Sequence, residues 1–487
     1  MTGKHRTRAQ TLPLRKPHGL RYAVTAGIAV AGCCALQLPA VASSTAAHTT
    51  AKAAVATGPV LSTPATGTPK LAATGTTETV RQLVQCGGTM YAVGSFTEIQ
   101  RFTTTYPRNN IFSFSATPGF KVNTWAPDVN GEINSIAFNG SNCNEAFIGG
   151  QFTSVNGTKV ANFAKISTKT GNVVSGFGDR VGGGHVDTIL GVKGHLLVGG
   201  TFTSINGSTA DPYYASVSPS TGVDDGFLHL GISGHYVFPK VKNNGTEVYN
   251  QQLSHSGKLL LVEGDFTQVG GLGRQQIFML NVNQTPVKVT GWSSPEFDGS
   301  KGEIPGGYPY QCGDSHPFYI HAAAWSPDDS TIYIADTGIH TWNWNGQFPM
   351  PGLCDAAAAF PASEKEVLHD WIANDGCDSL YSVAADNSAV YVAGHNRWFP
   401  NGDACNTQGK GAIPAPGLAG LTPGSAGGSL IENSSGKAGL YSRSRGHGAD
   451  DMLLTPRGLW IASDNFGGNT SCGGVPGYAG ICFLPYS

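Results

Sequence analysis

A ten-residue pattern occurs twice in this chain, as Ile-Gly-Gly-Gln-Phe-Thr-Ser-Val-Asn-Gly at Ile148–Gly157 and as Val-Gly-Gly-Thr-Phe-Thr-Ser-Ile-Asn-Gly at Val198–Gly207. An apolar run that ends in small residues before an Asn-Gly pair is typical of a β-strand leading into a tight turn. The strand part recurs in seven copies, roughly 50 to 70 residues apart, which predicts a repeat protein. The seven copies are Met90–Phe96, Ala146–Phe152, Leu196–Phe202, Leu260–Phe266, Ile332–Asp336, Val390–Gly394 and Leu459–Asp464.

A further apolar run precedes each copy, and a turn signal joins the two segments. Gly and Asn supply most of these turns, as at Gly87-Gly88, because they adopt the positive φ of a tight hairpin at little cost. A third strand follows the stronger copies, for example at Ala161–Ile166 and Tyr214–Ser218, and a turn then leads to a fourth. The preceding strands are predicted at Thr79–Cys86, Glu132–Phe138, Val186–Val192, Glu247–Leu253, Tyr319–Trp325, Leu380–Ala384 and Asp450–Thr455.

Seven repeats of a four-stranded antiparallel unit predict an all-β fold, a seven-bladed β-propeller. Radial closure protects the edges of each sheet by packing them on the neighbouring blades. The last unit has only three predicted strands, the third at Gly480–Pro485, before the chain ends. We therefore expect the N-terminal segment near Pro69–Thr77 to supply the fourth strand and close the last blade.

Residues 1–42 have the features of a secretory signal peptide. Basic residues precede an apolar run from Tyr22 to about Leu38, and Ala40-Val41-Ala42 fits a cleavage site. Lipoprotein anchoring at Cys33 stays open, because Val30-Ala31-Gly32-Cys33 resembles a lipobox. Residues 43–75 are rich in Ala, Thr, Ser and Pro, which predicts a disordered segment, and residues 76–487 form the propeller. We therefore expect a secreted, extracellular protein with no membrane span.

The chain becomes acidic once the signal peptide is removed. It holds 30 Lys and Arg against 32 Asp and Glu, and six of the bases but none of the acids precede residue 43. The mature chain then has 24 bases against 32 acids, a net charge of −8. This balance argues against nucleic acid or an anionic membrane as partner. We expect a monomer whose partner is an extracellular glycan or protein.

Eight of the ten cysteines lie beyond the signal peptide, and an even number in an exported chain predicts disulfides. None of them forms a Cys-x-x-Cys pair, so a zinc or redox site is not favoured. Three of the expected bridges hold loops of the later units, and the fourth joins the turns of two adjacent early units. The expected pairs are Cys86–Cys143, Cys312–Cys354, Cys377–Cys405 and Cys472–Cys482.

The Val-Gly-Gly-x-Phe-Thr-x-Val/Ile-Asn-Gly string resembles the delta-60-type repeats of secreted bacterial β-propellers. The C-terminal third is similar to a set of exported actinobacterial propeller proteins, on the strength of Tyr391–Trp398, Arg443–Gly448 and Gly458–Asp464. The resemblance covers roughly residues 77–487. It implies the propeller fold and implies neither an activity nor a set of site residues.

Propeller topology predicts which loops share a face. Loops that enter a first strand and loops that leave a second strand lie on one rim around the central channel, where ligands commonly bind. Long loops and ionisable groups gather there in units four to seven. The residues expected on this rim are His185, His235, His316, His321, His447, Asp265, Asp336, His340, Trp342, Trp344, His395, Arg397, Trp398, Asp464 and Asn465.

Two kinds of site are possible on the rim. His395 and His447, with Asp464 or Asp450, could shuttle protons or ligate a metal. Alternatively each is a hydrogen-bonded structural residue. For ligand binding, the tryptophans could stack on sugar rings and the arginines could fork a carboxylate, or both could pack blades together. The candidate ligand-binding residues are Trp342, Trp344, Arg397, Trp398 and Arg445.

No serine-hydrolase elbow, zinc-protease helix, P-loop or dinucleotide motif stands in its required context, and no EF-hand loop occurs. We expect no cofactor, with a metal ion left open. Two functions follow. The first is an exported propeller that binds an extracellular glycan or protein through this rim. The alternative is an extracellular hydrolase or lyase with a His/Asp site on the same rim.

Overall fold

The computed structural model describes residues 58–236, 245–297, 303–304, 308–309, 312, 317–339, 352–363, 365–431, 448–466 and 471–487. They belong to one compact unit, residues 48–487. Their regular structure is almost entirely β, with a short 3-10 helix, η1 (Pro295–Phe297). No helix in these ranges is long and apolar enough to cross a membrane.

Seven antiparallel sheets of three or four strands follow one another along the described chain. In each sheet the first strand pairs with the second and the second with the third. The sheets are, in order: β2 (Thr79–Cys86), β3 (Thr89–Ser95) and β6 (Ile111–Ser115); β7 (Glu132–Asn139), β8 (Asn142–Gln151) and β11 (Phe163–Ser167); β13 (Val186–Val192), β14 (His195–Gly200) and β16 (Tyr214–Val217); β17 (Glu247–Leu253), β18 (Leu259–Asp265), β21 (Ile277–Asn281) and β22 (Lys288–Val289); β25 (Tyr319–Trp325), β26 (Thr331–Thr337), β27 (Ala356–Pro361) and β28 (Trp371–Asn374); β29 (Leu380–Ala385), β30 (Val390–Gly394) and β33 (Leu418–Leu421); β34 (Ala449–Thr455), β35 (Gly458–Ser463) and β38 (Ile481–Pro485).

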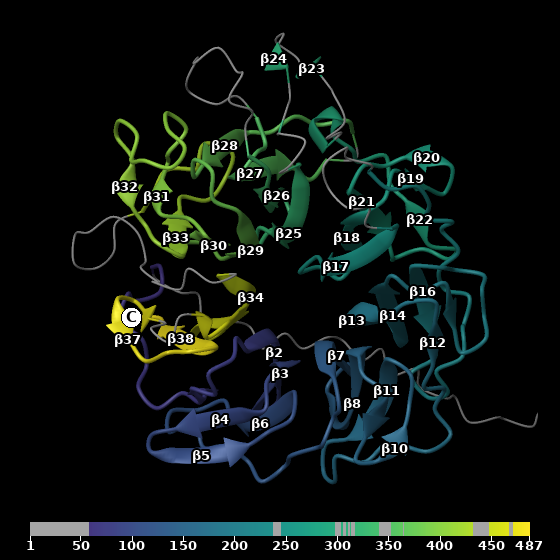
Figure 1. Cartoon of the computed structure of the whole chain (residues 1–487). Coiled ribbons are helices and arrows are strands. Elements are labelled where there is room, and N and C mark those ends of the chain that lie inside the picture. Colours follow the sequence, from purple (N-terminus) through teal and green to yellow (C-terminus); the bar gives the residue numbers. More distant parts are fainter. Residues whose placement is uncertain are drawn as a thin grey trace, which may run out of the picture. The chain divides into compact units, whose positions relative to one another are not determined.

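The seven first strands lie around a common centre (Figure 1). Each contacts the first strand of the next sheet, and β34 of the last sheet contacts β2 of the first. Repeated antiparallel sheets packed face to face around a centre are the architecture of a β-propeller. The all-β propeller class predicted from the repeats is confirmed.

Small ladders of two or, in one case, three strands accompany most sheets. Most of them lie in the connection between a second and a third strand, on the face where first strands begin and second strands end. We call this face the channel rim, and the opposite face, with the hairpins between first and second strands, the turn face. The ladders are β1 (Lys70–Leu71) with β4 (Glu98–Arg101) and β5 (Thr104–Pro107); β9 (Ser154–Val155) with β10 (Thr158–Lys159); β12 (Val181–Gly182) with β15 (Ser204–Ile205); β19 (Gln268–Val269) with β20 (Leu272–Gly273); β23 (Glu303–Ile304) with β24 (Tyr308–Pro309); β31 (Trp398–Phe399) with β32 (Ile413–Pro414); and β36 (Ser471–Cys472) with β37 (Val475–Pro476).

The predicted first strands agree with the structure to within a residue at each end, and β2, β13, β17 and β25 have the predicted bounds. The fourth strands were over-predicted. Only the fourth and fifth sheets have one, β22 and β28, whereas in the first, second, third and sixth sheets the fourth segment makes a single bridge, such as Phe114 with Val122. The outermost segment has one sheet neighbour only, so little holds it in strand geometry before the chain leaves for the next sheet.

The prediction for the N-terminal segment needs two corrections. β1 pairs with β4 of the first sheet and not with the last sheet, so Pro69–Thr77 is not a fourth strand there. Residues 58–75 are also ordered, because apolar residues such as Val60, 2% exposed, are buried. Earlier in this stretch, the amides of Leu61 and Ala65 donate to the carbonyls of Pro485 and Phe483 in β38, at 2.8 and 2.9 Å.

A small residue at the end of the second strand allows the first strand to approach it closely. A Cβ added at Gly94 would lie 2.0 Å from the carbonyl oxygen of Thr79, and one at Gly150 would lie 2.2 Å from that of Glu132. The same clash occurs at Gly200, Gly264 and Gly394. This backbone contact explains the glycine of the repeat, while the fifth and seventh sheets accommodate Asp336 and Ser463 at this place.

A left-handed residue precedes the third strand of every sheet. In six sheets its carbonyl accepts the amide hydrogen of the small residue that ends the second strand, as Asn110 does from Gly94 at 3.0 Å. Several of these side chains also reach the loop before the next sheet, as Asn110 does to the Val129 carbonyl at 2.8 Å. They therefore join sheet to sheet through the backbone. The residues, with φ between 52° and 77°, are Asn110, Asn162, Tyr213, Gln276, Asp355, Gly417 and Gly480.

The core lies between consecutive sheets. Phe147 of the second sheet packs in one buried cluster with Val198 of the third. Met90 and Phe112 of the first sheet share a cluster with Trp460 of the last, which is 1% exposed. The first and last sheets are thus packed on each other in the same way as sheets that are consecutive in sequence.

Four disulfides link the described cysteines, in the pairing predicted from their positions. Cys86–Cys143 joins the turn-face hairpins of the first two sheets. A bridge of this kind contributes about 2–4 kcal/mol to stability. The other three bridges are Cys312–Cys354, Cys377–Cys405 and Cys472–Cys482.

The close strand approach makes a specific prediction for Gly150→Ala. The added methyl would meet the Glu132 carbonyl, so the strands must separate, and we expect a loss of about 1–3 kcal/mol in the free energy of unfolding. Gly273→Ala is the matched control, because a Cβ there meets nothing within 4 Å. Chemical denaturation measures both variants. Equal stabilities for the two would contradict the backbone explanation of the repeat glycine.

Candidate functional site

Each first strand carries a β-bulge near its start, at the same place in all seven sheets. In the first sheet the register shifts between Val80 and Gln82, so Arg81 is the extra residue. A bulge re-aims the side chain of its extra residue and often occurs beside functional sites. We call these seven residues the bulge ring. They are Arg81, Asn134, Asp187, Tyr249, His321, Tyr381 and Asp450.

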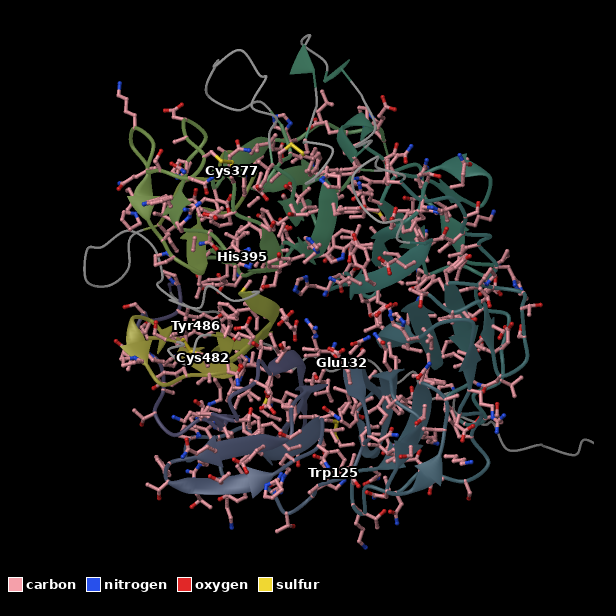
Figure 2. All side chains as sticks on the ribbon, viewed as in Figure 1. Trp125, Glu132, Cys377, His395, Cys482 and Tyr486 are labelled. Atoms are coloured by element: carbon pink, nitrogen blue, oxygen red, sulfur yellow. A yellow bond between two sulfur atoms is a disulfide. The ribbon has the colours of Figure 1, made fainter. Side chains whose placement is uncertain are left out.

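The bulge ring is polar or aromatic throughout and lines the middle of the channel rim. Every member is partly exposed, whereas the apolar residue before it is buried, as Val80 is before Arg81. Figure 2 shows Glu132, the first residue of β7, and His395, which follows β30, close to the centre of the seven sheets. The repeated bulge therefore places one ionisable or hydrogen-bonding side chain per sheet around the central axis.

Arg81 ties three sheets together within this ring. Its Nε donates to Glu132 of the second sheet at 2.7 Å, and its Nη1 donates to Asp450 of the seventh at 2.8 Å. Burial lowers the pKa of Arg81, but the two carboxylates outweigh it and leave the pKa above its usual value. The guanidinium neutralises much of the negative charge on this side of the ring.

The second and third sheets are joined through Asp187. Its Oδ1 accepts hydrogen bonds from the amide of Asn134 at 2.9 Å and lies 3.1 Å from Nε2 of His185. This interaction raises the pKa of His185, and the nearby carboxylates of Glu247 and Glu132 raise it further. The His185 ring is therefore a partial counter-charge to the acids around it.

Glu247 and Asp265 bring two more carboxylates to the rim. They are opposite each other in the β17–β18 ladder, and like charges in that position repel. Burial, with the charges of Asp187 and Asp265, raises the pKa of Glu247 to about 7. Burial also raises the pKa of Asp265, which is 1% exposed and accepts the Tyr236 amide at 2.9 Å. The third and fourth sheets thus form the acidic side of the ring.

The opposite side of the ring is aromatic. Tyr249 donates its hydroxyl to the carbonyl of Ile320 in the fifth sheet. Rings then follow each other, with His321 4.8 Å from Tyr381 and Tyr381 5.2 Å from His395 between centroids. Burial and the neighbouring His395 lower the pKa of His321 to about 4, so His321 is neutral near pH 7.

The predicted candidates are distributed unevenly over this arrangement. His395 lies beside the bulge ring, and its amide donates to the Ser379 carbonyl at 2.8 Å. Asp464 is 1% exposed at the end of the seventh sheet, where Oδ1 accepts the amide of Phe466 at 3.0 Å. His447, the partner proposed for both, lies outside the described residues. The structure thus describes only part of the predicted His/Asp constellation.

The two described candidates for ligand binding contact each other and the protein. Arg397 donates to Asp378 at 2.6 Å and to Asn406 at 2.9 Å, and its guanidinium lies 4.7 Å from the ring of Trp398. A ligand carboxylate would therefore compete with Asp378 for Arg397. Trp342, Trp344 and Arg445 lie outside the described residues. Within the described ranges, no group of three or more His, Cys, Asp or Glu side chains is placed to hold a metal ion.

Sequence reasoning placed His185, His321 and Asp265 on this rim but missed most of the ring, including Arg81 and Asp187. One signal was available in the first strands. Each has a buried apolar residue, then a polar or aromatic one, then a small or polar one, as in Val-Arg-Gln at 80–82 and Ile-Asn-Ser at 133–135. Such an interruption of the alternation at one repeated position is a sign of a bulge.

Large apolar residues are exposed mainly around the channel rim. Of seven such residues in the described chain, five lie in connections between a second and a third strand. Val223 and Leu368 follow third strands and lie on the turn face. Exposed apolar side chains therefore surround the polar centre of this face. The five rim residues are Phe102, Leu272, Ile413, Phe466 and Val475.

The fold and ring define a β-propeller with a polar channel rim. No family model and no curated protein matches the chain. Solved structures that it is similar to include the Cps50 (Swd1) β-propeller domain of Myceliophteria thermophila, with 7% identity, 64% of this chain and 80% of that chain covered, and a TM-score of 0.37. The WD40 β-propeller domain of Doa1 has 11% identity, coverage of 88% and 96%, and a TM-score of 0.37. Sqt1 of Saccharomyces cerevisiae has 10% identity, coverage of 84% and 96%, and a TM-score of 0.42.

The raised pKa of Glu247 predicts that its ionised carboxylate lowers the stability of the folded protein. The pKa rises from 4.5 to about 7 on folding, so the folded state holds the proton more tightly and stability falls as the pH rises through this window. Glu247→Gln removes the titration. We expect the stability of this variant relative to wild type to increase by at most about 3 kcal/mol between pH 4.5 and pH 8.

Thermal or chemical unfolding at several pH values measures this difference. Glu98→Gln, a carboxylate on the outer ladder of the first sheet, is the control and should keep a constant difference from wild type. A constant difference for Glu247→Gln as well would show that Glu247 titrates normally in the folded protein.

Proposed function

We propose that this chain is an exported binding propeller that recognises an extracellular partner through its channel rim. The observation that carries the proposal is the bulge ring, in which seven sheets each place a polar or aromatic, partly exposed side chain around one axis. Repetition of one backbone bulge with five types of side chain gives a frame for a specific surface. Function on such scaffolds belongs to the site and not to the fold.

We infer that the seven sheets are the seven blades of a closed propeller. Two contacts support closure between the first and the last sheet, the Arg81–Asp450 ion pair and the cluster around Trp460. The backbone hydrogen bonds from Leu61 and Ala65 to β38 place residues 61–65 along the open edge of the last blade. This stretch, and not Pro69–Thr77, is our candidate for the segment that completes it.

Export and a protein partner agree with other features of the chain. Four disulfides fit an oxidising compartment, and the signal-like first 42 residues direct a chain there. The exposed apolar residues around the rim favour a protein over a neutral glycan, because a protein partner offers apolar side chains against which they can be buried. The alternative, a hydrolase or lyase built on His395 and His447, stays a prediction.

A capture experiment tests the rim. The purified protein is immobilised and exposed to the culture secretome, and bound proteins are quantified by mass spectrometry. We expect a partner that is retained by wild type and lost, by about tenfold or more, when Phe102, Leu272 and Phe466 are changed together to Ser. These three are 66%, 43% and 59% exposed, so the changes should not disturb the core.

The matched control changes Val223 and Leu368 of the turn face to Ser, two residues that are 56% and 41% exposed. It should retain the partner at the wild-type level. Equal loss of the partner in both variants would contradict recognition of a protein through the channel rim. So would a second outcome, in which no protein is captured and the rim variant binds a glycan array at the wild-type level.

A further inference from the structure

Three carboxylates lie at the junction of the third and fourth sheets, on the acidic side of the bulge ring. We call Asp187, Glu247 and Asp265 the carboxylate site. Glu247 and Asp265 are opposite each other in one ladder, and the charges of Asp187 and Asp265 both act on Glu247. The three acids therefore share one region of negative potential on the channel rim.

The hydrogen bonds of the described residues leave much of this site unsatisfied. Oδ1 of Asp265 accepts the Tyr236 amide, but its buried Oδ2 has no hydrogen-bond partner, and the residue is 1% exposed. Oδ2 of Asp187 is likewise buried without a partner. A buried acceptor without a donor is costly, so a bound proton or a hydrogen-bond donor at this place would be stabilising.

Charge compensation is also uneven around the ring. Glu132 and Asp450 share the guanidinium of Arg81. At the carboxylate site the neighbouring bases are imidazoles, His185 beside Asp187 and His235 near Asp265. The carboxylate site therefore lacks the guanidinium partner that Glu132 and Asp450 share.

We propose that the carboxylate site binds the side-chain ammonium or guanidinium group of a lysine or arginine presented by the protein partner. This rests on the proposed function and specifies its ligand chemistry. A basic side chain has several donors spread over its head group, and these suit acceptors that come from two sheets. Tyr319 is close enough to be affected by the same carboxylates, because burial and the charges of Asp265 and Glu247 raise its pKa. Its phenol ring could interact with a cation bound there.

An organic cation fits better than a metal ion. In the described part of the chain, no three acidic or histidine side chains converge closely enough to hold a metal. Exposed apolar residues such as Leu272 of the fourth sheet surround the polar centre, and a protein segment can contact both at once. The basic side chain would then be a central, charge-assisted anchor within an apolar periphery.

Fluorescence anisotropy of labelled capped tetralysine with the full chain at low salt tests the proposal directly. The same peptide with acetylated lysines tests the need for charge. We expect tetralysine to bind, the acetylated peptide not to bind, and Glu247→Gln with Asp187→Asn to raise the dissociation constant about tenfold or more. Both substitutions keep side-chain size and a hydrogen-bond acceptor. Glu98→Gln, outside the ring, should leave binding unchanged.

Two arms test competing occupants. Lys240 and Lys242 belong to the chain itself, outside the described residues, and are changed together to Ala. Tetralysine binding that occurs only in this variant would assign the site to the chain's own lysines and overturn the proposal. If millimolar calcium chloride competes as well as free tetralysine does, the site is assigned to a metal ion, and this result would also overturn the proposal.

The result can be separated from that of the capture experiment. If the secretome partner is retained by wild type but equally by Glu247→Gln/Asp187→Asn, and tetralysine binds both proteins alike, the carboxylate site is not its anchor although the channel rim still binds. If tetralysine binds only the wild type and displaces the partner, both proposals are supported.

Discussion

Close contact between the end of each second strand and the start of each first strand underlies the whole arrangement. At Gly94 and Gly150 the carbonyl of the first strand occupies the space that a Cβ would need. The first strand bulges beside this contact, so its extra residue is turned away from the ladder and remains partly exposed. The repeated backbone contact and bulge thus place a ring of polar or aromatic side chains around an axis.

The same device separates stability from recognition. The apolar residue before each bulge is buried between sheets, and left-handed residues such as Asn110 join one sheet to the loop of the next through side-chain hydrogen bonds to its backbone. The bulge residue itself is free to vary, and the seven sheets use a cation, three acids or amides, two tyrosines and a histidine there. Recognition can therefore change without repacking of the core.

Electrostatics then divide the ring into unlike sides. Arg81 balances Glu132 and Asp450 where the first sheet lies between the second and the last. The third and fourth sheets keep carboxylates with histidines as their nearest counter-charges, and the fifth and sixth supply neutral rings. A partner would meet a stabilised seam, an acidic site and an aromatic side on one surface, and the acidic site offers the strongest unsatisfied interaction.

Local sequence alone determined the repeat, the first strands, the all-β propeller class and the cysteine pairing, because alternation, turn residues and spacing act within a single sheet or between neighbouring ones. It placed His185, His321 and Asp265 on the correct rim for the same reason. Only the tertiary structure showed the bulges, since a one-residue register shift depends on both strands of a ladder. Only it showed that residues 61–65 hydrogen-bond to β38 whereas β1 pairs with β4, and that Arg81 meets Asp450 across a separation of 369 residues. Contacts between sheets distant in sequence depend on how the whole ring packs, and no local pattern records that packing.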